Sequence, residues 1–120
     1  MAASLNEEQR QHMMELQKRM NDVATNLNAV THSARRATAE GRRATLVLQE
    51  LGSIPADAVL YTGVGRAYLR SDRGAVAAQH EETKTKAEAE MKALLGARER
   101  LLADKAACEA DARELMAGAR

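Results

Sequence analysis

Aromatic residues are almost absent from this sequence of 120 residues, which has no phenylalanine, no tryptophan and only two tyrosines. Because aromatic side chains supply much of the bulk of globular cores, this shortage argues against a compact, self-sufficient core. Alanine, glutamate, lysine, arginine and leucine dominate the composition instead, which is typical of long helices and coiled coils.

Cysteine and any excess of charge are also scarce. The single cysteine, Cys108, excludes an internal disulfide and fits a reducing compartment. With 18 basic and 17 acidic residues, the net charge of +1 argues against a dedicated nucleic-acid or anionic-membrane binder. The segment "MAASLNEEQRQ" has no apolar signal core and no apolar run approaches 18 residues, so we expect a cytoplasmic protein that is neither secreted nor membrane-spanning.

A heptad pattern runs through the first half of the chain. Apolar and small residues alternate at spacings of three and four for more than five heptads, which predicts a coiled-coil helix over residues 4–51. We expect a capping box from Ser4 and Glu7 at its start, and Gly52 at the C′ position before Pro55. The predicted seam consists of Met13, Leu16, Met20, Val23, Leu27, Val30, Ala34, Ala37, Gly41, Ala44, Leu48 and Leu51.

The second half repeats this pattern less regularly and predicts a helix over residues 72–117, capped by Ser71 or Asp72. Arg98 and Lys105 interrupt its seam, which otherwise consists of Ala87, Met91, Leu94, Leu101, Cys108, Ala112 and Leu115. A second, weaker apolar stripe follows one position away, at Leu95, Leu102 and Ala106.

Between the helices, "ADAVLYTGVGRAYLRSD" alternates apolar and polar residues around two glycines and predicts a β-hairpin over residues 57–70. Its turn lies within Gly63–Arg66, where either glycine can adopt a positive φ, so the strand register stays open. An isolated hairpin is marginal in water. We therefore expect hairpins from several chains to join in a shared sheet or barrel.

These elements predict a mainly α fold in one unit, residues 1–120, with two long helices in an antiparallel coiled coil joined by the hairpin. Matching seam positions across the pair gives two registers, in which the numbers of facing residues add up to 121 or to 128. The first places Leu27 opposite Leu94 and matches more large residues, so it is the register that we prefer.

The order helix, hairpin, helix, with "YTGVGRAYL" at its centre, resembles the prefoldin family, in particular the β-type subunits and among them subunit 1. The resemblance continues at Ser71, Ala75, Val76 and Gln79 and covers the whole chain in pattern. Gly74 departs from the family pattern, which has an acidic residue at this helix start. Through the hairpin, the resemblance is carried by Tyr61, Gly63, Val64, Gly65 and Arg66.

The resemblance implies an ATP-independent cytosolic co-chaperone rather than an enzyme. Its partners would be other prefoldin subunits in a hexamer of two α-type and four β-type chains, non-native clients such as actin and tubulin, and the group II chaperonin. Assembly would use the hairpin residues Val59, Leu60, Tyr61, Gly63, Val64, Gly65, Arg66, Tyr68 and Leu69.

Surplus methionine and leucine residues mark the two chain ends, which the predicted fold brings together away from the hairpin. Methionine is flexible and polarizable and suits promiscuous binding surfaces. These side chains either contact clients, which we favour, or merely close the seam. The predicted tip residues are Met13, Met14, Leu16, Met20, Leu115 and Met116.

No pattern in the sequence indicates catalysis, a cofactor or a metal. "GVG" lacks the spacing of a phosphate loop, and His12, His32 and His80 are too scattered for a metal pair. Cys108 fits the seam as a small apolar residue. "ARRATAEGRRA" at 34–44 indicates a solvated face or contacts with an acidic partner rather than a nucleic-acid patch, because no aromatic residues accompany its arginines.

Two other functions stay open on the sequence. A structural coiled-coil adaptor would pair with one defined protein partner, but it would need only a turn and not two apolar strands. A basic helical nucleic-acid binder would show steep salt dependence on any duplex.

Overall fold

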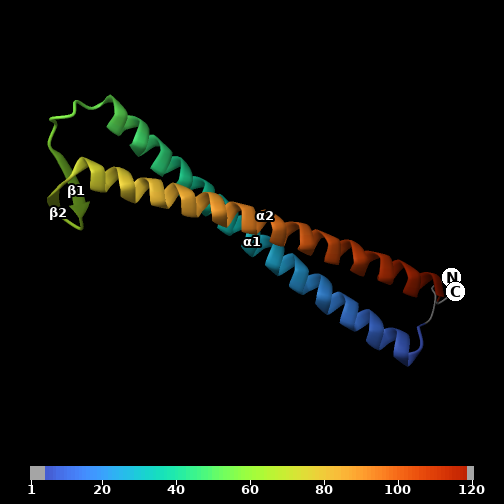
Figure 1. Cartoon of the computed structure of the whole chain (residues 1–120). Coiled ribbons are helices and arrows are strands. Elements are labelled where there is room, and N and C mark those ends of the chain that lie inside the picture. Colours follow the sequence, from blue (N-terminus) through green and yellow to red (C-terminus); the bar gives the residue numbers. More distant parts are fainter. Residues whose placement is uncertain (1–4, 119–120) are drawn as a thin grey trace. The chain divides into compact units, whose positions relative to one another are not determined.

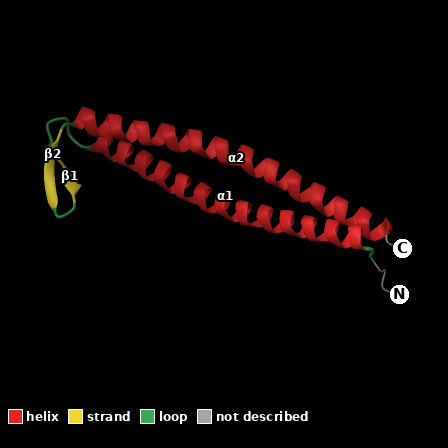
Figure 2. Ribbon diagram, turned by 90° about the horizontal axis from the view of Figure 1, so that it is seen from below, coloured by secondary structure: helices red, strands yellow, loops and turns green. Residues whose placement is uncertain are grey.

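The computed structural model describes residues 5–118, which form two long helices joined by a β-hairpin (Figures 1 and 2). Helix α1 spans Glu7–Ser53, strands β1 and β2 span Leu60–Val64 and Ala67–Ser71, and helix α2 spans Arg73–Gly118. The predicted mainly α class and the order of its elements are confirmed. The chain divides into two compact units. The hairpin unit consists of residues 34–92, and the terminal unit consists of the chain segments that precede residue 34 and follow residue 92.

Helix α1 begins three residues later than predicted, at Glu7, because a different capping box starts it. The side chain of Asn6 accepts a hydrogen bond from the Gln9 backbone N–H at 2.8 Å, and the Gln9 side chain accepts one from the Asn6 N–H at 2.9 Å. This reciprocal pair satisfies two N–H groups that the first turn leaves free. The predicted cap, Ser4, lies outside the described residues.

The end of α1 also differs from the prediction. Gly52 lies inside the helix and has no positive φ, so it is not a left-handed C′ residue. The helix continues to Ser53, whose hydroxyl donates to the Glu50 carbonyl at 2.8 Å and satisfies one of the last free acceptors.

At the start of α2, Asp72 is the N-cap, as one of the two predicted alternatives had it. Its carboxylate accepts a hydrogen bond from the Ala75 N–H at 3.1 Å. Ser71 instead lies in β2, where its hydroxyl is 2.6 Å from that of Thr62.

The hairpin turn is formed by Gly65 and Arg66, between the paired residues Val64 and Ala67. Gly65 has φ 61°, and no non-glycine residue among those described has a positive φ. A two-residue loop with positive φ only at its first residue is the type II′ pattern, whose twist matches that of the flanking strands. The structure thus chooses Gly65 from the two glycines that the sequence left open.

In the hairpin unit, small residues let the two helices approach closely. A Cβ added at Gly41 would lie 3.3 Å from the Cβ of Ala87, and the Thr38 hydroxyl lies 3.3 Å from the Met91 sulfur. The numbers of these facing residues add up to 128 and 129. The preferred register of 121 is therefore wrong for this unit, and the alternative of 128 is confirmed there.

The terminal unit has the same register. Arg19 faces Asp111 with 4.0 Å between the guanidinium and the carboxylate, and His12 lines the same surface hollow as Leu115. As the residue number rises along α1, from His12 to Arg19, the number of the facing residue on α2 falls, from Leu115 to Asp111. The helices are therefore antiparallel in this unit too. A register of 128 places Met20 opposite Cys108, and the Cys108 side chain is fully buried.

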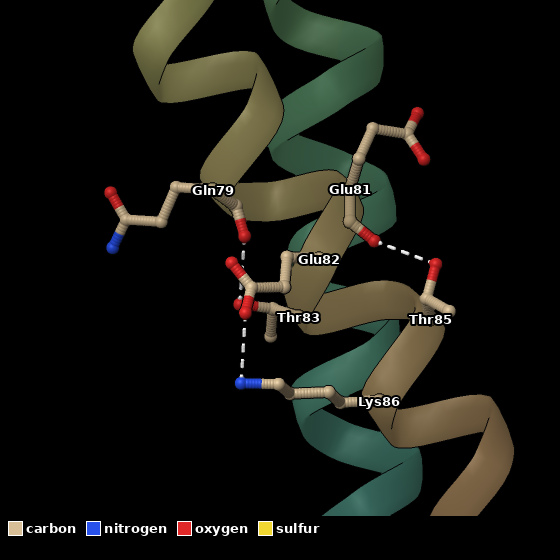
Figure 3. A network of polar contacts seen from close by, with 6 residues as sticks. All are labelled: Gln79, Glu81, Glu82, Thr83, Thr85 and Lys86. Atoms are coloured by element: carbon tan, nitrogen blue, oxygen red, sulfur yellow. Dashed lines mark hydrogen bonds and ion pairs between the residues drawn. The ribbon is translucent and has the colours of Figure 1, made fainter.

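The predicted seam of α1 is confirmed along its length, since every one of its positions is buried or half-buried. On α2 the predicted apolar seam residues are likewise covered, whereas Arg98 and Lys105 are exposed. Residues 79–86 of α2 carry a group of polar contacts: the hydroxyls of Thr83 and Thr85 donate to carbonyls of the preceding turn, and the Lys86 ammonium lies 2.9 Å from the Glu82 carboxylate (Figure 3).

Candidate assembly and client-binding surfaces

Both faces of the hairpin carry exposed apolar side chains. Because cross-strand partners point to the same side of a sheet, the pairing of Tyr61 with Arg70 and of Gly63 with Tyr68 places both tyrosines on one face. The pairs of Thr62 with Leu69 and Val64 with Ala67 form the other. Tyr61 is 64% exposed and Leu69 is 58% exposed, so neither face is covered within this chain.

The strands also have open edges. Among the described residues β1 pairs only with β2, so the outer edge of each strand presents free N–H and C=O groups. Such edges are ready to pair with another chain. Of the other predicted assembly residues, Val59, Gly65 and Arg66 are exposed and Leu60 is half-buried.

The segment that leads into the hairpin is held by an arginine that the sequence analysis did not single out. Arg73 donates from its two terminal nitrogens to the carbonyls of Ile54 and Pro55, at 2.7 and 3.0 Å. The planar fork of arginine suits two neighbouring acceptors. It thereby anchors the end of α1 to the start of α2, beside a hollow of about 390 Å³ lined by residues 56–60 and 70–73.

The six predicted tip residues all lie in the terminal unit, but they differ in exposure. Met14 is 70% exposed and Met116 is 47% exposed, while Met13, Met20 and Leu115 are half-buried. Leu16 is only 2% exposed, so it is a packing residue of the seam and has no surface to offer a client. The expectation that Leu16 contacts clients is thus corrected by its burial.

Two shallow hollows lie next to these methionines and leucines in the terminal unit. One, of about 420 Å³, is lined by His12, Asp111, Glu114 and Leu115, and the other, of about 370 Å³, has Met116 in its wall. The first hollow is lined by the acidic side chains of Asp111 and Glu114, and the second is more apolar, so the unit presents both charged and apolar surface.

Other apolar residues are exposed along the helices. Leu95 and Leu102 form the second stripe that the sequence predicted on α2. Leu46 of α1 is 60% exposed, and the sequence analysis missed it. Leu46 does not fall on the heptad seam, and this misfit could have identified it as an exposed apolar residue from the sequence.

Within residues 5–118, no group of three or more histidine, cysteine or acidic side chains is placed to hold a metal ion. Over the same residues, neither helix contains an apolar stretch long enough to cross a bilayer.

Comparison with solved structures places the chain in a known fold class. It resembles the crystal structure of the prefoldin beta subunit from Thermococcus strain KS-1, with a TM-score of 0.77 over 98% of this chain and 97% of that chain. Sequence identity is 19%, so this likeness shows the fold alone. A comparison with curated proteins found no match.

The sequence itself matches the family model described as "Prefoldin subunit" over residues 7–119. The chain therefore belongs to the prefoldin subunit family. Members of this family are non-enzymatic chaperone subunits, and membership implies assembly with other prefoldin subunits.

Proposed function

We propose that the chain is a β-type subunit, nearest to subunit 1, in a cytoplasmic hexamer of two α-type and four β-type chains. The hexamer binds non-native polypeptides such as actin and tubulin without ATP and delivers them to the group II chaperonin. The observation that carries this proposal is the hairpin, whose two faces and two edges are all uncovered in the single chain.

Assembly through the hairpin follows from the cost of leaving that surface in water. Burying apolar area contributes about 25 cal/mol per Å², and free strand edges favour pairing with another chain. Hairpins that pair edge to edge satisfy each other's free strand edges. When the joined strands close into a barrel or stack as two sheets, one face of each hairpin is covered as well. A coiled-coil adaptor would have no need for Tyr61 and Leu69 on opposite faces of the hairpin.

Client binding follows from the uneven exposure of the terminal unit. Met14 and Met116 remain in solvent although the seam beside them is closed by Leu16. Flexible thioether side chains adapt to irregular apolar surfaces. Each chain alone binds a client weakly, and several chains in one assembly bind it more tightly because the second contact is intramolecular.

The test replaces both exposed methionines, in the variant Met14→Gln/Met116→Gln, and reconstitutes it with its partner subunits. Glutamine has a helix propensity close to that of methionine, so the helices persist. The matched control is Leu95→Gln/Leu102→Gln, which removes two exposed apolar side chains from the same unit. Light scattering reports the aggregation of a denatured client, such as actin, diluted into each assembly.

We expect the methionine variant to assemble normally and to suppress aggregation about three- to tenfold less well, since part of each side chain stays wet in the complex. The control should protect like the wild type. Equal protection by all three assemblies would show that the methionines do not hold clients, and equal loss in both variants would show that any exposed apolar residue serves.

A further inference from the structure

Four arginines share one face of α1 in the hairpin unit. They form two adjacent pairs seven residues apart, Arg35 with Arg36 and Arg42 with Arg43. Seven residues are nearly two helical turns, so the pairs lie on the same side, about 10 Å apart along the axis. Ala37 and Ala44, which are buried against α2, lie on the other side of the helix.

These four guanidinium groups have no acidic partner in the hairpin unit. All four side chains are exposed, and within residues 5–118 none lies within 4.0 Å of a carboxylate. Glu40 is one turn from both Arg36 and Arg43, yet it forms an ion pair with neither. The chain as a whole is nearly neutral, with a net charge of +1, so the positive charge here is a local concentration.

Two apolar residues lie on the same line along α1 as two of the arginines. Ala39 and Leu46 continue the spacing of three and four set by Arg35 and Arg42, so all four follow one straight path along the helix. The side chain of Leu46 stands in solvent at its end. Apolar residues flanked by unpaired charges at heptad spacing are the features with which a second helix docks in a coiled coil.

We propose that this basic face, residues 35–46 of α1, binds an acidic amphipathic helix of a partner protein. Carboxylates of that helix, repeated one heptad apart, pair with the two arginine pairs, and an apolar side chain one turn beyond the second carboxylates covers Leu46. Nucleic acid fits less well, because no aromatic side chain accompanies the arginines to stack on bases and because the exposed leucine has no counterpart on a phosphate backbone.

The test measures binding of a fluorescent three-heptad helical peptide with two adjacent glutamates and one leucine in each heptad. A second peptide has glutamine for every glutamate, and a 20-base-pair RNA duplex is the third probe. The proteins are the full chain, the variant Arg35→Gln/Arg36→Gln/Arg42→Gln/Arg43→Gln, and a control. The control, Arg10→Gln/Lys18→Gln/Arg98→Gln/Arg100→Gln, removes the same charge from exposed positions of the terminal unit.

The full chain should bind the glutamate peptide in preference to the glutamine peptide and the RNA. The variant on the basic face should bind it about tenfold more weakly, as expected for four exposed ion pairs, and the control should lose less than about twofold. Circular dichroism checks that helicity is kept. Should the variant unfold, the charge-reversed pair Arg42→Glu/Arg43→Glu takes its place, and it should then prefer a lysine version of the peptide.

Equal losses in the variant and the control would overturn the proposal, because binding would follow net charge alone. Tighter binding of RNA than of the glutamate peptide would overturn it in favour of a nucleic-acid site. Self-association of the full chain that the same four substitutions abolish would overturn it in favour of a second copy as the occupant.

Discussion

Along the seam, apolar side chains are covered by the same chain, whereas in the hairpin they stand in solvent. Leu16, Val23, Leu51 and Cys108 are buried by helix packing alone. Tyr61, Val64, Tyr68 and Leu69 have similar or greater bulk but remain exposed. A two-stranded sheet is a single layer with nothing packed on its faces, whereas two paired helices can each bury one apolar stripe against the other.

This contrast separates two kinds of interaction. Contacts along the seam hold each unit of the single chain together, and we propose that the hairpin provides the contacts that join chains. Substitutions in the seam should therefore reduce the stability of the chain, while substitutions in the hairpin should reduce assembly and leave the helices formed.

The largest effect is expected from the variant Tyr61→Asp/Leu69→Asp, which places a charge on each face of the hairpin. Burying an unpaired carboxylate is so costly that assembly with partner subunits should weaken by about a hundredfold or more. Gel filtration of reconstituted mixtures measures assembly, and circular dichroism should show unchanged helicity. The control, Gln49→Asp/Gln79→Asp, adds the same charge to exposed helix positions and should assemble normally.

A smaller effect, and one on stability, is expected from Leu16→Ala in the seam. Removing a buried leucine side chain should lower the free energy of unfolding by about 2–5 kcal/mol. The matched control, Leu95→Ala, truncates a leucine that is largely exposed in the same unit and should change it by less than about 1 kcal/mol. Urea unfolding followed by circular dichroism compares the two, and equal losses would contradict the assigned seam.

The smallest effect concerns the close approach of the helices in the hairpin unit. Gly96→Ala should stabilise α2 by up to about 1 kcal/mol through helix propensity, because nothing lies within 4 Å of the added Cβ. Gly41→Ala should gain clearly less, since its Cβ would meet that of Ala87 at 3.3 Å. Thermal unfolding of both variants measures the difference, and equal gains would show that the helices are not close at Gly41.

The sequence was sufficient for the features that depend on repetition. More than five heptads specify the seam of α1, because every turn repeats the same information. The alternation around "GVG" likewise predicted the hairpin. Single events were harder: the capping box moved from Ser4 to Asn6, since two neighbouring segments fit the same short motif.

The register was mispredicted for a physical reason. Counting matched large residues favoured 121, but the approach of Gly41 to Ala87 rewards small residues that such a count ignores. The contacts of Arg73 with Ile54 and Pro55 match the observed register at the end of α1. They join residues that are 18 and 19 positions apart, and no local sequence motif predicts them. At the chain ends the heptad pattern separated Leu16, on the seam, from Met14, off it, but their exposed fractions of 2% and 70% needed the structure.

Hydrogen exchange tests most directly whether partner subunits cover what the chain leaves open. Mass spectrometry would compare backbone exchange in the free chain with that in its reconstituted assembly, peptide by peptide. We predict that residues 60–71 of the hairpin exchange quickly in the free chain and become protected on assembly, while the seam segments of α1 change little. Equal exchange of the hairpin in both states, with new protection along the helices instead, would contradict the account.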